Sequence, residues 1–335
     1  MTHRVLVTGG AGYIGSHTAK CLAQAGFEPV TLDNLSSGHR WAVKWGPLVE
    51  GDIADQELVR EIVAHYRVEA VLHLAAYASV GESMRAPRKY FNNNVIGSMR
   101  LIDAVLDSSV KHFIFSSTCA TYGLPRQVPI KESHPQNPVN PYGVSKLMIE
   151  QALKWHGEAY GLKSVCLRYF NAAGADPDGE LGEVHDPETH LIPRTIGAVL
   201  GTLDSVEIYG SDYDTRDGSA IRDYTHVMDL AEAHVLALQY LLDGGKSDAF
   251  NLGTGQGHSV LQVIDTVGRV AGRRIEADLC MRRLGDPPVL VADPSKARAI
   301  LDWRPAFPNL DSIVRTAWDW HCAWEESSSI SAEAV

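Results

Sequence analysis

A glycine-rich turn between an apolar strand and a helix constrains this chain more than any other feature. Gly9, Gly12 and Gly15 follow the apolar run Arg4–Thr8 at intervals of three residues. Glycines at this spacing let the backbone approach a pyrophosphate, which then binds at the positive end of the next helix. Asp33 ends the next predicted strand, where a carboxylate accepts hydrogen bonds from ribose hydroxyls and repels a 2′-phosphate. The pattern therefore favours an NAD site over the alternative of two tight turns without a ligand.

The first half of the chain alternates short apolar runs with amphipathic stretches of helical length. Such alternation is typical of an α/β fold with a doubly wound parallel (Rossmann) sheet and helices on both faces. The expected strands are Arg4–Thr8, Pro29–Asp33, Leu48–Gly51, Ala70–Leu74, His112–Ser116 and Ser164–Arg168. The expected helices are Ile14–Ala25, Glu57–Tyr66, Tyr90–Ser108 and Tyr142–Tyr160.

Beyond Asn171 the spacing loosens, which predicts a smaller C-terminal α/β lobe that binds the substrate. We expect residues 1–171 to form the NAD-binding domain, with about 211–258 returning to it, and 172–325 to form mainly the second lobe. Gly, Pro and acidic residues in Ala175–His190 predict a loop or lid over a site. Residues 326–335 are small and polar, which predicts a disordered tail. The other elements expected are Leu191–Leu203, Val206–Tyr209, Val227–Leu242, Ala249–Leu252, Ser259–Val270, Ile275–Leu279 and Leu310–Trp324.

Composition excludes several classes of protein and partner. With 335 residues, 45% of them hydrophobic, the chain can bury a sizeable core. Its net charge of -11 offers no basic surface, so nucleic acid is not an expected partner. No signal peptide or membrane-spanning run is evident, so no membrane partner is expected. The five cysteines form no Cys-x-x-Cys or Cys/His group, which predicts a cytoplasmic protein without a metal site.

A tyrosine and a lysine four residues apart form the candidate catalytic pair. Tyr142 and Lys146 would lie on the same face of the predicted helix. A nearby cation stabilises phenolate and lowers the pKa of tyrosine from about 10 toward neutrality, where it can act as a general base. The pair follows Ser116–Thr118 at the carboxyl edge of the sheet, where ligands of this fold bind. We expect Thr118 to hydrogen-bond a reacting hydroxyl, with a satisfied strand-end hydroxyl as the alternative.

Seven further segments carry a resemblance to a known family. They are residues 8–17, 32–35, 80–83, 92–95, 140–143, 168–174 and 222–227. In these segments the chain resembles the extended short-chain dehydrogenase/reductase superfamily, and within it the UDP-glucose 4-epimerases, from Val5 to about Trp320. The resemblance implies that Tyr142 removes the C4 hydroxyl proton of a UDP-sugar while NAD takes the C4 hydride, assisted by Lys146 and Thr118. The 4-ketose would then turn while UDP stays fixed, and hydride would return to its other face.

The same resemblance implies contacts for both ligands. Asp52 and Ile53 would flank the adenine, and Arg222 and Arg283 could grip the diphosphate in forked geometry, with solvated surface charge as the alternative. The cofactor residues would be Gly9, Gly12, Tyr13, Ile14, Gly15, Asp33, Asn34, Asp52, Ile53, Leu74, Asn93, Ser116, Tyr142, Lys146, Tyr169 and Phe170. The UDP-sugar residues would be Ser116, Thr118, Tyr142, Asn171, His190, Leu191, Tyr209, Arg222, Arg283, Asp286 and Leu290.

Three departures narrow the activity that the resemblance implies. Cys119-Ala120 stands where related sugar-nucleotide dehydratases have an acidic pair, which argues against a dehydratase. Ala78 stands where some epimerases have a lysine near the cofactor, so no extra cationic contact is expected there. Leu290 aligns with a position that limits sugar size and is smaller than an aromatic residue but larger than cysteine. The acceptance of N-acetylated sugars is therefore open.

Three functions are compatible with these residues. The first is a hexose 4-epimerase, and the second is an epimerase of UDP-xylose and UDP-arabinose, because residues 116–123 also resemble those enzymes. The third is a non-catalytic NAD-sensing protein that has kept the fold, for which the intact Thr118, Tyr142 and Lys146 set gives no support. The helices Tyr90–Ser108 and Tyr142–Tyr160 resemble those of a four-helix dimer interface in the family, so a homodimer is expected.

Overall fold

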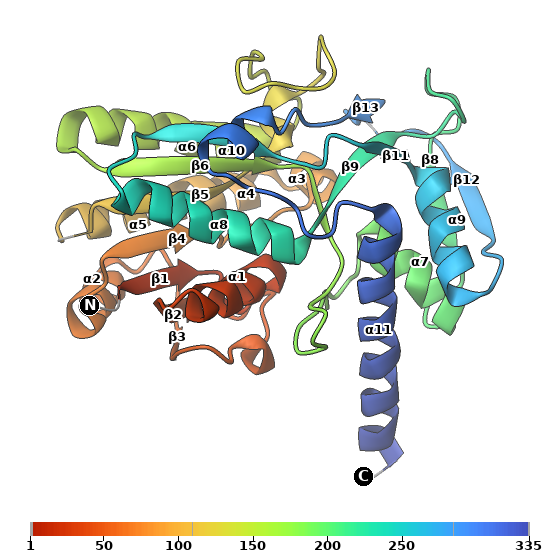
Figure 1. Cartoon of the computed structure of the whole chain (residues 1–335), viewed down its shortest axis with the longest axis horizontal. Coiled ribbons are helices and arrows are strands. Elements are labelled where there is room, and N and C mark those ends of the chain that lie inside the picture. Colours follow the sequence, from red (N-terminus) through yellow and green to blue (C-terminus); the bar gives the residue numbers. More distant parts are fainter. Residues whose placement is uncertain (1–2, 109, 284, 334–335) are drawn as a thin grey trace.

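The computed structural model describes residues 3–108, 110–283 and 285–333, the last six in backbone only. Its larger part is a seven-stranded parallel sheet (Figure 1) of order β10-β6-β5-β4-β1-β2-β3. The order reverses between β1 and β4, and sheets of this kind bind ligands at such a switch point, beyond the carboxyl ends of the strands. The predicted doubly wound fold is confirmed. The strands are β1 (Arg4–Thr8), β2 (Glu28–Asp33), β3 (Leu48–Glu50), β4 (Ala70–His73), β5 (His112–Thr118), β6 (Lys163–Tyr169) and β10 (Asp248–Leu252).

Helices cover both faces of this sheet because its strands are apolar on both sides. Along β1, Val5 and Val7 belong to the core beneath α1 (Tyr13–Gln24) and α8 (Val227–Leu242). Leu6, between them, belongs to the opposite core. That second core is covered by three further helices, α2 (Gln56–Tyr66), α5 (Ser98–Leu106) and α6 (Pro141–Tyr160). Because successive side chains of a strand point to opposite faces of the sheet, β1 contributes residues to both cores.

The prediction of one regular α-helix over Tyr90–Ser108 is wrong. The structure has α4 (Pro87–Tyr90), then a π-helical segment η2 (Phe91–Gly97), and only then α5. Within η2 the buried Asn94 exchanges hydrogen bonds of 3.0 Å with both the backbone N–H and the C=O of Tyr77. Wide turns of this kind occur where a side chain must be aimed at a site. Here the turn directs a polar side chain toward the loop that follows β4.

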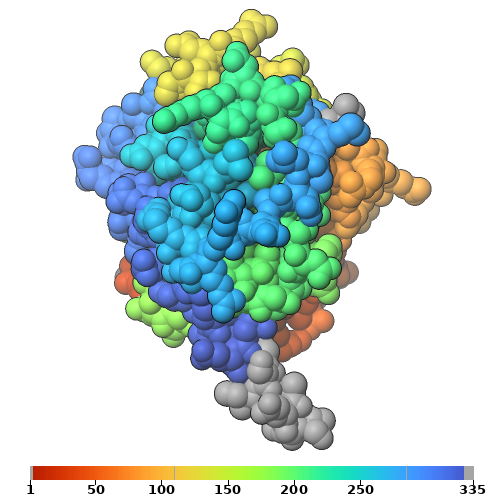
Figure 2. All heavy atoms as spheres, turned by 90° about the vertical axis from the view of Figure 1, so that its right-hand side faces the viewer, coloured from red at the N-terminus to blue at the C-terminus, as the bar shows by residue number. Residues whose placement is uncertain are grey.

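A second lobe forms from the later part of the chain. Its four-stranded sheet is built around β9 (Ile221–His226), which pairs with β7 (Asn171–Ala173), β11 (Gly257–Ser259) and β13 (Val289–Leu290). A separate pair joins β8 (Val206–Tyr209) to β12 (Ala277–Cys280). Figure 2 shows the outer face of this lobe as one continuous surface. The helices and turns not yet named are η1 (Arg40–Ala42), α3 (Val80–Arg85), η3 (Cys119–Tyr122), α7 (Leu191–Leu200), α9 (Val260–Ala271), α10 (Ser295–Ile300) and α11 (Leu310–Glu333).

The central strand of the second lobe was not expected from the sequence. β9 carries Arg222, Asp223, Thr225 and His226, all buried, so it has no apolar run to mark it. Most of these groups have partners: Asp223, for example, accepts hydrogen bonds from the backbone N–H groups of Thr254 and Ala292, whereas the Thr225 hydroxyl has none. A buried strand with mostly polar side chains cannot be recognised from a pattern of hydrophobic residues.

The C-terminal helix corrects the predicted tail. α11 continues to Glu333 instead of ending near Trp324, so residues 326–333 are helical rather than disordered. No glycine or proline follows Leu310, and the rings of Trp320 and Trp324 pack on Trp41 with centroids 5.8 and 4.9 Å away. A helix anchored in this way extends at little cost. Residues 334–335 of the predicted tail lie outside the described residues.

Two further observations concern the remaining segments. The range 174–190 contains no helix or strand, as predicted for a loop. Across the described residues, no helix has both the length and the apolar character needed to cross a bilayer.

A buried histidine at the end of β4 joins the sheet to its helical layer. Each ring nitrogen of His73 shares a 2.7 Å hydrogen bond with a hydroxyl, Nδ1 with Thr8 on β1 and Nε2 with Ser98 at the start of α5. Burial lowers the pKa of His73 from 6.5 to about 3, so the folded protein holds the neutral ring.

Acid should therefore destabilise the fold partly through His73. Because the folded pKa lies below the unfolded value, the stability that is present above pH 6.5 is lost as pH falls toward 3. The loss is up to about 1.4 kcal/mol per pH unit for one proton. We expect His73→Gln to reduce the slope of the unfolding free energy against pH between about pH 6 and 4, measured by urea denaturation. His65→Gln, at an exposed position, is the control, and equal slopes in wild type and both variants would refute the prediction.

Candidate functional site

A single cavity of about 960 Å³ lies at the switch point and extends to the second lobe. Its walls include the β1–α1 turn, the ends of β2 and β5, and the first turn of α6 from the large sheet. The second lobe contributes the start of α7 and residues of β9 and β13. The cavity therefore brings together side chains that are far apart in sequence.

The glycine turn at the end of β1 has room for no side chain. Gly9 has a φ of +73°, and a Cβ there would lie 2.6 Å from the backbone nitrogen of Ala75. A Cβ on Gly15 would lie 2.0 Å from the carbonyl oxygen of Gly9. α1 then begins at Gly12 without a capping side chain or an acidic residue in its first turn. Its free N–H groups and positive dipole end fit the pyrophosphate of a dinucleotide.

Asp33 is held at the cavity wall by backbone donors. Its Oδ2 accepts from the N–H of Ala11 at 2.9 Å and its Oδ1 from the N–H of Leu35 at 2.8 Å. Burial raises the pKa of this carboxyl, and the two N–H groups oppose the rise. Each oxygen keeps a free lone pair, which fits hydrogen bonds from ribose hydroxyls.

The structure does not place Asp52 on the cavity wall. Its exposed carboxylate instead accepts hydrogen bonds from Asn34 Nδ2 at 3.1 Å and from the N–H of Ala54 at 2.8 Å. Asn34 and Ile53 do line the cavity. Asp52 thus lies directly beside two residues of the cavity wall, and its contact with the adenine stays a prediction.

The three predicted catalytic residues all line the cavity. Thr118 ends β5, where its hydroxyl accepts from the N–H of Ala120 at 3.1 Å. Tyr142 lies in the first turn of α6, which Asn140 caps by accepting from the N–H of Gly143 at 2.8 Å. One turn later, the Nζ of Lys146 donates to the carbonyl of Ser116 at 2.7 Å and lies 6.0 Å from the centre of the Tyr142 ring.

Burial changes the expected protonation of this pair. The pKa of Tyr142 is raised above its usual 10, chiefly by burial, while Thr118 opposes the rise. Burial also lowers the pKa of Lys146 to about 7, which the nearby Glu150 carboxylate opposes. The prediction that Lys146 lowers the pKa of Tyr142 toward neutrality is therefore wrong for the protein without ligands. Both charges are disfavoured where water is excluded, so phenolate needs a further positive charge nearby.

Two arginines line the other end of the cavity. The guanidinium of Arg222 donates to Asp286 Oδ1 at 2.5 Å and to the carbonyl of Ile221 at 2.7 Å. Arg283 lies with its guanidinium carbon 3.9 Å from the centre of the Tyr209 ring. A stacked and a carboxylate-braced guanidinium can both present N–H groups to a diphosphate.

The remaining predicted residues also line the cavity, and they come from both lobes. They are Tyr13, Ile14, Leu74, Asn93, Ser116, Tyr169, Phe170, Asn171, His190, Leu191 and Leu290. Ser116 and Tyr169 join their hydroxyls in a hydrogen bond at the ends of β5 and β6. Ala78 and Cys119 face the same cavity. Burial raises the pKa of Cys119 to about 12, so its thiol stays protonated and does not replace an acidic catalyst.

Sequence reasoning missed several residues on the wall. No site role is predicted for α3 (Val80–Arg85), although four of its first five residues and Arg85 line the cavity. Glu183 and His185 in the loop after β7, and Arg194 on α7, line it as well. The Glu-x-His spacing at 183–185 is a signal in the sequence that could have indicated these residues.

The fold and the site define a protein of the dinucleotide-binding class with a tyrosine, a lysine and a threonine together on the wall of its cavity. The model of the NAD dependent epimerase/dehydratase family matches residues 5–253. A UDP-glucose 4-epimerase of Rhizobium meliloti (strain 1021) is 52% identical over 319 residues, which cover 95% of this chain and 97% of that protein. The chain belongs to the NAD dependent epimerase/dehydratase family.

Solved structures agree with this membership. A UDP-glucose 4-epimerase from Brucella ovis in complex with NAD superposes with a TM-score of 0.92 at 53% identity, covering 95% of this chain and 98% of that one. A UDP-glucose-4-epimerase from Stenotrophomonas maltophila, with bound NAD and formylated UDP-arabinopyranose, has a TM-score of 0.93 at 38% identity, covering 97% and 99%.

The close packing of the glycine turn can be tested with one methyl group. We expect Gly15→Ala to force the turn apart, to destabilise the protein by about 1–3 kcal/mol and to weaken NAD binding. Calorimetric titration with NAD and urea denaturation measure the two effects. Gly26→Ala is the control for NAD binding, because a Cβ there meets no atom within 4 Å, although the φ of +84° means that alanine also costs stability at this position. NAD affinity that is equal in the two variants would contradict this account of the turn.

Proposed function

We propose that this protein interconverts UDP-glucose and UDP-galactose by inverting C4 of the sugar with a bound NAD. The observation that carries the proposal is one cavity that holds Tyr142, Lys146 and Thr118 beside the uncapped start of α1 and Asp33. The relatives named UDP-glucose 4-epimerases, one of them in complex with NAD, support it over almost the whole chain.

Tyr142, Thr118 and Lys146 have different roles in the proposed reaction. Bound NAD would supply the acceptor and later the donor of the C4 hydride, and its oxidised nicotinamide is a cation. Tyr142 takes the proton of the C4 hydroxyl and returns it after the 4-keto sugar has turned. Thr118 hydrogen-bonds that hydroxyl, and Lys146, which is anchored on the Ser116 carbonyl, favours the phenolate by its charge. The positive charges around Tyr142 oppose the rise in pKa that burial causes.

The two arginines hold the part of the substrate that does not react. Arg222 and Arg283 bind the diphosphate of UDP, and Asp286 keeps the Arg222 guanidinium in place. Binding energy gained on the fixed nucleotide leaves the sugar free to present either face. Inversion at C4 requires both a fixed nucleotide and a sugar that can turn.

A pentose substrate is the second candidate. The Stenotrophomonas maltophila enzyme, which is named a UDP-glucose-4-epimerase, was solved with a formylated UDP-arabinopyranose. A pentose lacks the C6 group, so a cavity that admits a hexose has room for it.

Incubation with sugar nucleotides tests the proposal directly. The purified protein is given UDP-galactose or UDP-xylose, with and without added NAD, and the sugar products are resolved. We expect UDP-glucose from UDP-galactose. Conversion of UDP-xylose alone would move the assignment to pentoses, and tight NAD binding without any turnover would show a non-catalytic NAD-binding protein.

The role of Tyr142 predicts a selective loss of activity. Tyr142→Phe removes only the hydroxyl, so we expect kcat to fall at least about 100-fold while the affinity for NAD stays close to that of the wild type. Tyr160→Phe, at the exposed end of the same helix, is the matched control. Turnover of Tyr142→Phe at the wild-type rate would eliminate Tyr142 as the base.

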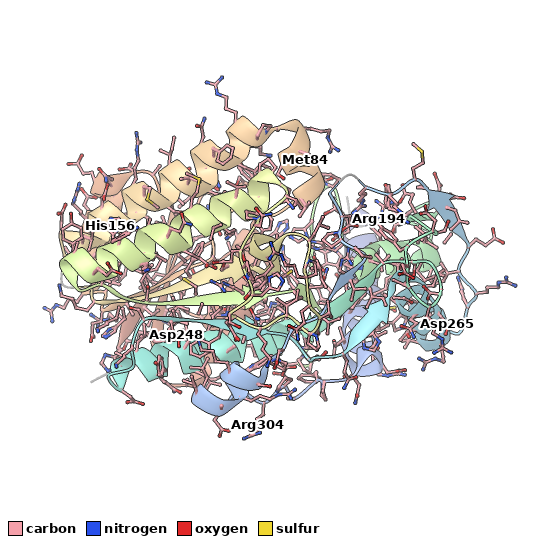
Figure 3. The ribbon with its side chains drawn as sticks, turned by 90° about the horizontal axis from the view of Figure 1, so that it is seen from above. Met84, His156, Arg194, Asp248, Asp265 and Arg304 are labelled. Carbon is pink, nitrogen blue, oxygen red and sulfur yellow. The ribbon has the colours of Figure 1, made fainter. Side chains whose placement is uncertain are left out.

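We also propose that two copies of the chain associate through η2, α5 and α6. Figure 3 shows α6 running beside the α4–η2–α5 segment at one side of the molecule. Three large apolar side chains on η2 and α6 are exposed, Ile96 by 48%, Met148 by 43% and Trp155 by 64%. Exposed apolar residues on adjacent helices are typical of an interface. Four helices, two from each copy, would cover them.

A charge on this helical surface should separate the copies. We expect the wild type to have the mass of a dimer in light scattering at micromolar concentration, and Trp155→Asp to shift it toward the monomer. Met281→Asp replaces an apolar residue that is 90% exposed in the second lobe and serves as the control. A monomeric wild type would end the proposal.

The compartment that we infer is the cytoplasm. All five cysteines are free thiols, and Cys119 and Cys166 are buried. Unpaired cysteines are typical of proteins in a reducing environment.

A further inference from the structure

The loop between β7 and α7 gathers four side chains that can ligate a metal. Glu183, His185, Glu188 and His190 each offer one ligand atom, and these atoms lie within 4.8 Å of one another. They stand close together in the sequence Glu-Val-His-Asp-Pro-Glu-Thr-His. The cluster belongs to one loop, so it can form around an ion without help from distant elements.

The spacing of the donor atoms suits one central ion. His185 Nδ1 is 3.1 Å from Glu183 Oε1 and 3.6 Å from Glu188 Oε2. His190 Nδ1 contacts the same oxygen of Glu183 and is 3.9 Å from Glu188 Oε1. Ligands bound about 2.0–2.2 Å from zinc in a tetrahedron are about 3.3–3.6 Å apart. Small adjustments of these side chains would therefore close the shell.

Hydrogen bonds and ion pairs within the cluster leave it incompletely satisfied. Glu188 Oε2 is buried and accepts no hydrogen bond, since its nearest donor, His185 Nδ1, is 3.6 Å away, and this is costly for a carboxylate oxygen. The other oxygen of Glu188 is fixed by the backbone N–H groups of Thr189 at 2.7 Å and His190 at 2.8 Å. Both imidazoles turn the same nitrogen, Nδ1, to the inside. A cation at the centre would give this oxygen a close partner and would be reached by both rings at once.

A neighbouring cluster in the same loop shows the contrast. The carboxylates of Asp176, Asp178 and Glu180 already surround the Nζ of Lys20, at distances of 2.7 to 2.8 Å. An internal cation fills that cluster. Within the part of the chain that the structure describes, no lysine or arginine is paired with Glu183 or Glu188 in the same manner.

We propose that Glu183, His185, Glu188 and His190 bind one divalent transition-metal ion of the zinc type. Two imidazole nitrogens with two carboxylate oxygens suit zinc and its neighbours, whereas Mg²⁺ and Ca²⁺ prefer oxygen ligands alone. Four protein ligands make the site structural rather than open to substrate. The ion would hold the loop against the first turn of α1. There the rings of His185 and Tyr13 are perpendicular, with their centroids 6.4 Å apart.

The test uses the full chain and zinc alone. The protein is stripped with a chelator, dialysed and titrated with ZnSO₄, and bound zinc is counted by elemental analysis. Cobalt(II) is added to a second sample, because tetrahedral nitrogen and oxygen ligands give it intense visible absorption. We expect one ion per chain, a higher melting temperature with zinc, and an affinity at least about tenfold weaker in both His185→Gln and Glu188→Gln.

A matched variant separates this site from general surface binding. Glu180→Gln lies in the same loop but in the cluster that Lys20 fills, so it should bind zinc like the wild type. Far-ultraviolet circular dichroism confirms that each variant is folded, and Glu188→Gln keeps the shape of the side chain. Less than stoichiometric zinc in the wild type, or equal affinity in all four proteins, would overturn the proposal. Neither result depends on turnover, so the proposed activity and the metal site can fail separately.

Discussion

Close approach of backbone to backbone at the end of β1 is the constraint on which the rest of this structure depends. The N–H of Gly9 donates to the carbonyl of Leu32 on β2 at 2.9 Å, and the N–H of Leu74, after β4, donates to the carbonyl of Thr8 at 3.0 Å. The turn is thus joined to both neighbours of β1 at the point where the strand order reverses. Only a residue without a side chain fits at Gly9, and α1 begins uncapped because its N-cap residue is Gly12.

Burial then determines what the side chains around this point can do. It raises the pKa of Tyr142 and lowers that of Lys146 to about 7, so above neutral pH the protein without ligands holds both mainly in their neutral forms. A pair that is neutral at rest can respond strongly to a charge that enters the cavity, because electrostatic interactions are strong where water is excluded. The site is in this sense completed by its ligands.

The second lobe contributes a different kind of wall. Its central strand β9 is held by buried hydrogen bonds of Asp223, and its neighbour Arg222 reaches the cavity braced by Asp286. The loop before α7 adds a cluster of histidines and glutamates beside the start of α1. The second lobe has apolar clusters of its own, but polar groups with defined partners form much of the wall that it turns to the cavity.

The sequence by itself determined the large sheet, the glycine turn and the Tyr142–Lys146 pair, because these depend on local periodicity and spacing. β1 has the predicted bounds, and the other strands of the first half differ from prediction by one or two residues at an end. Only the tertiary structure decided the π turn at Asn94, the polar strand β9 and the pKa of Tyr142. Each of these follows from contacts between segments that are distant in sequence, and from the exclusion of water, neither of which a local pattern records.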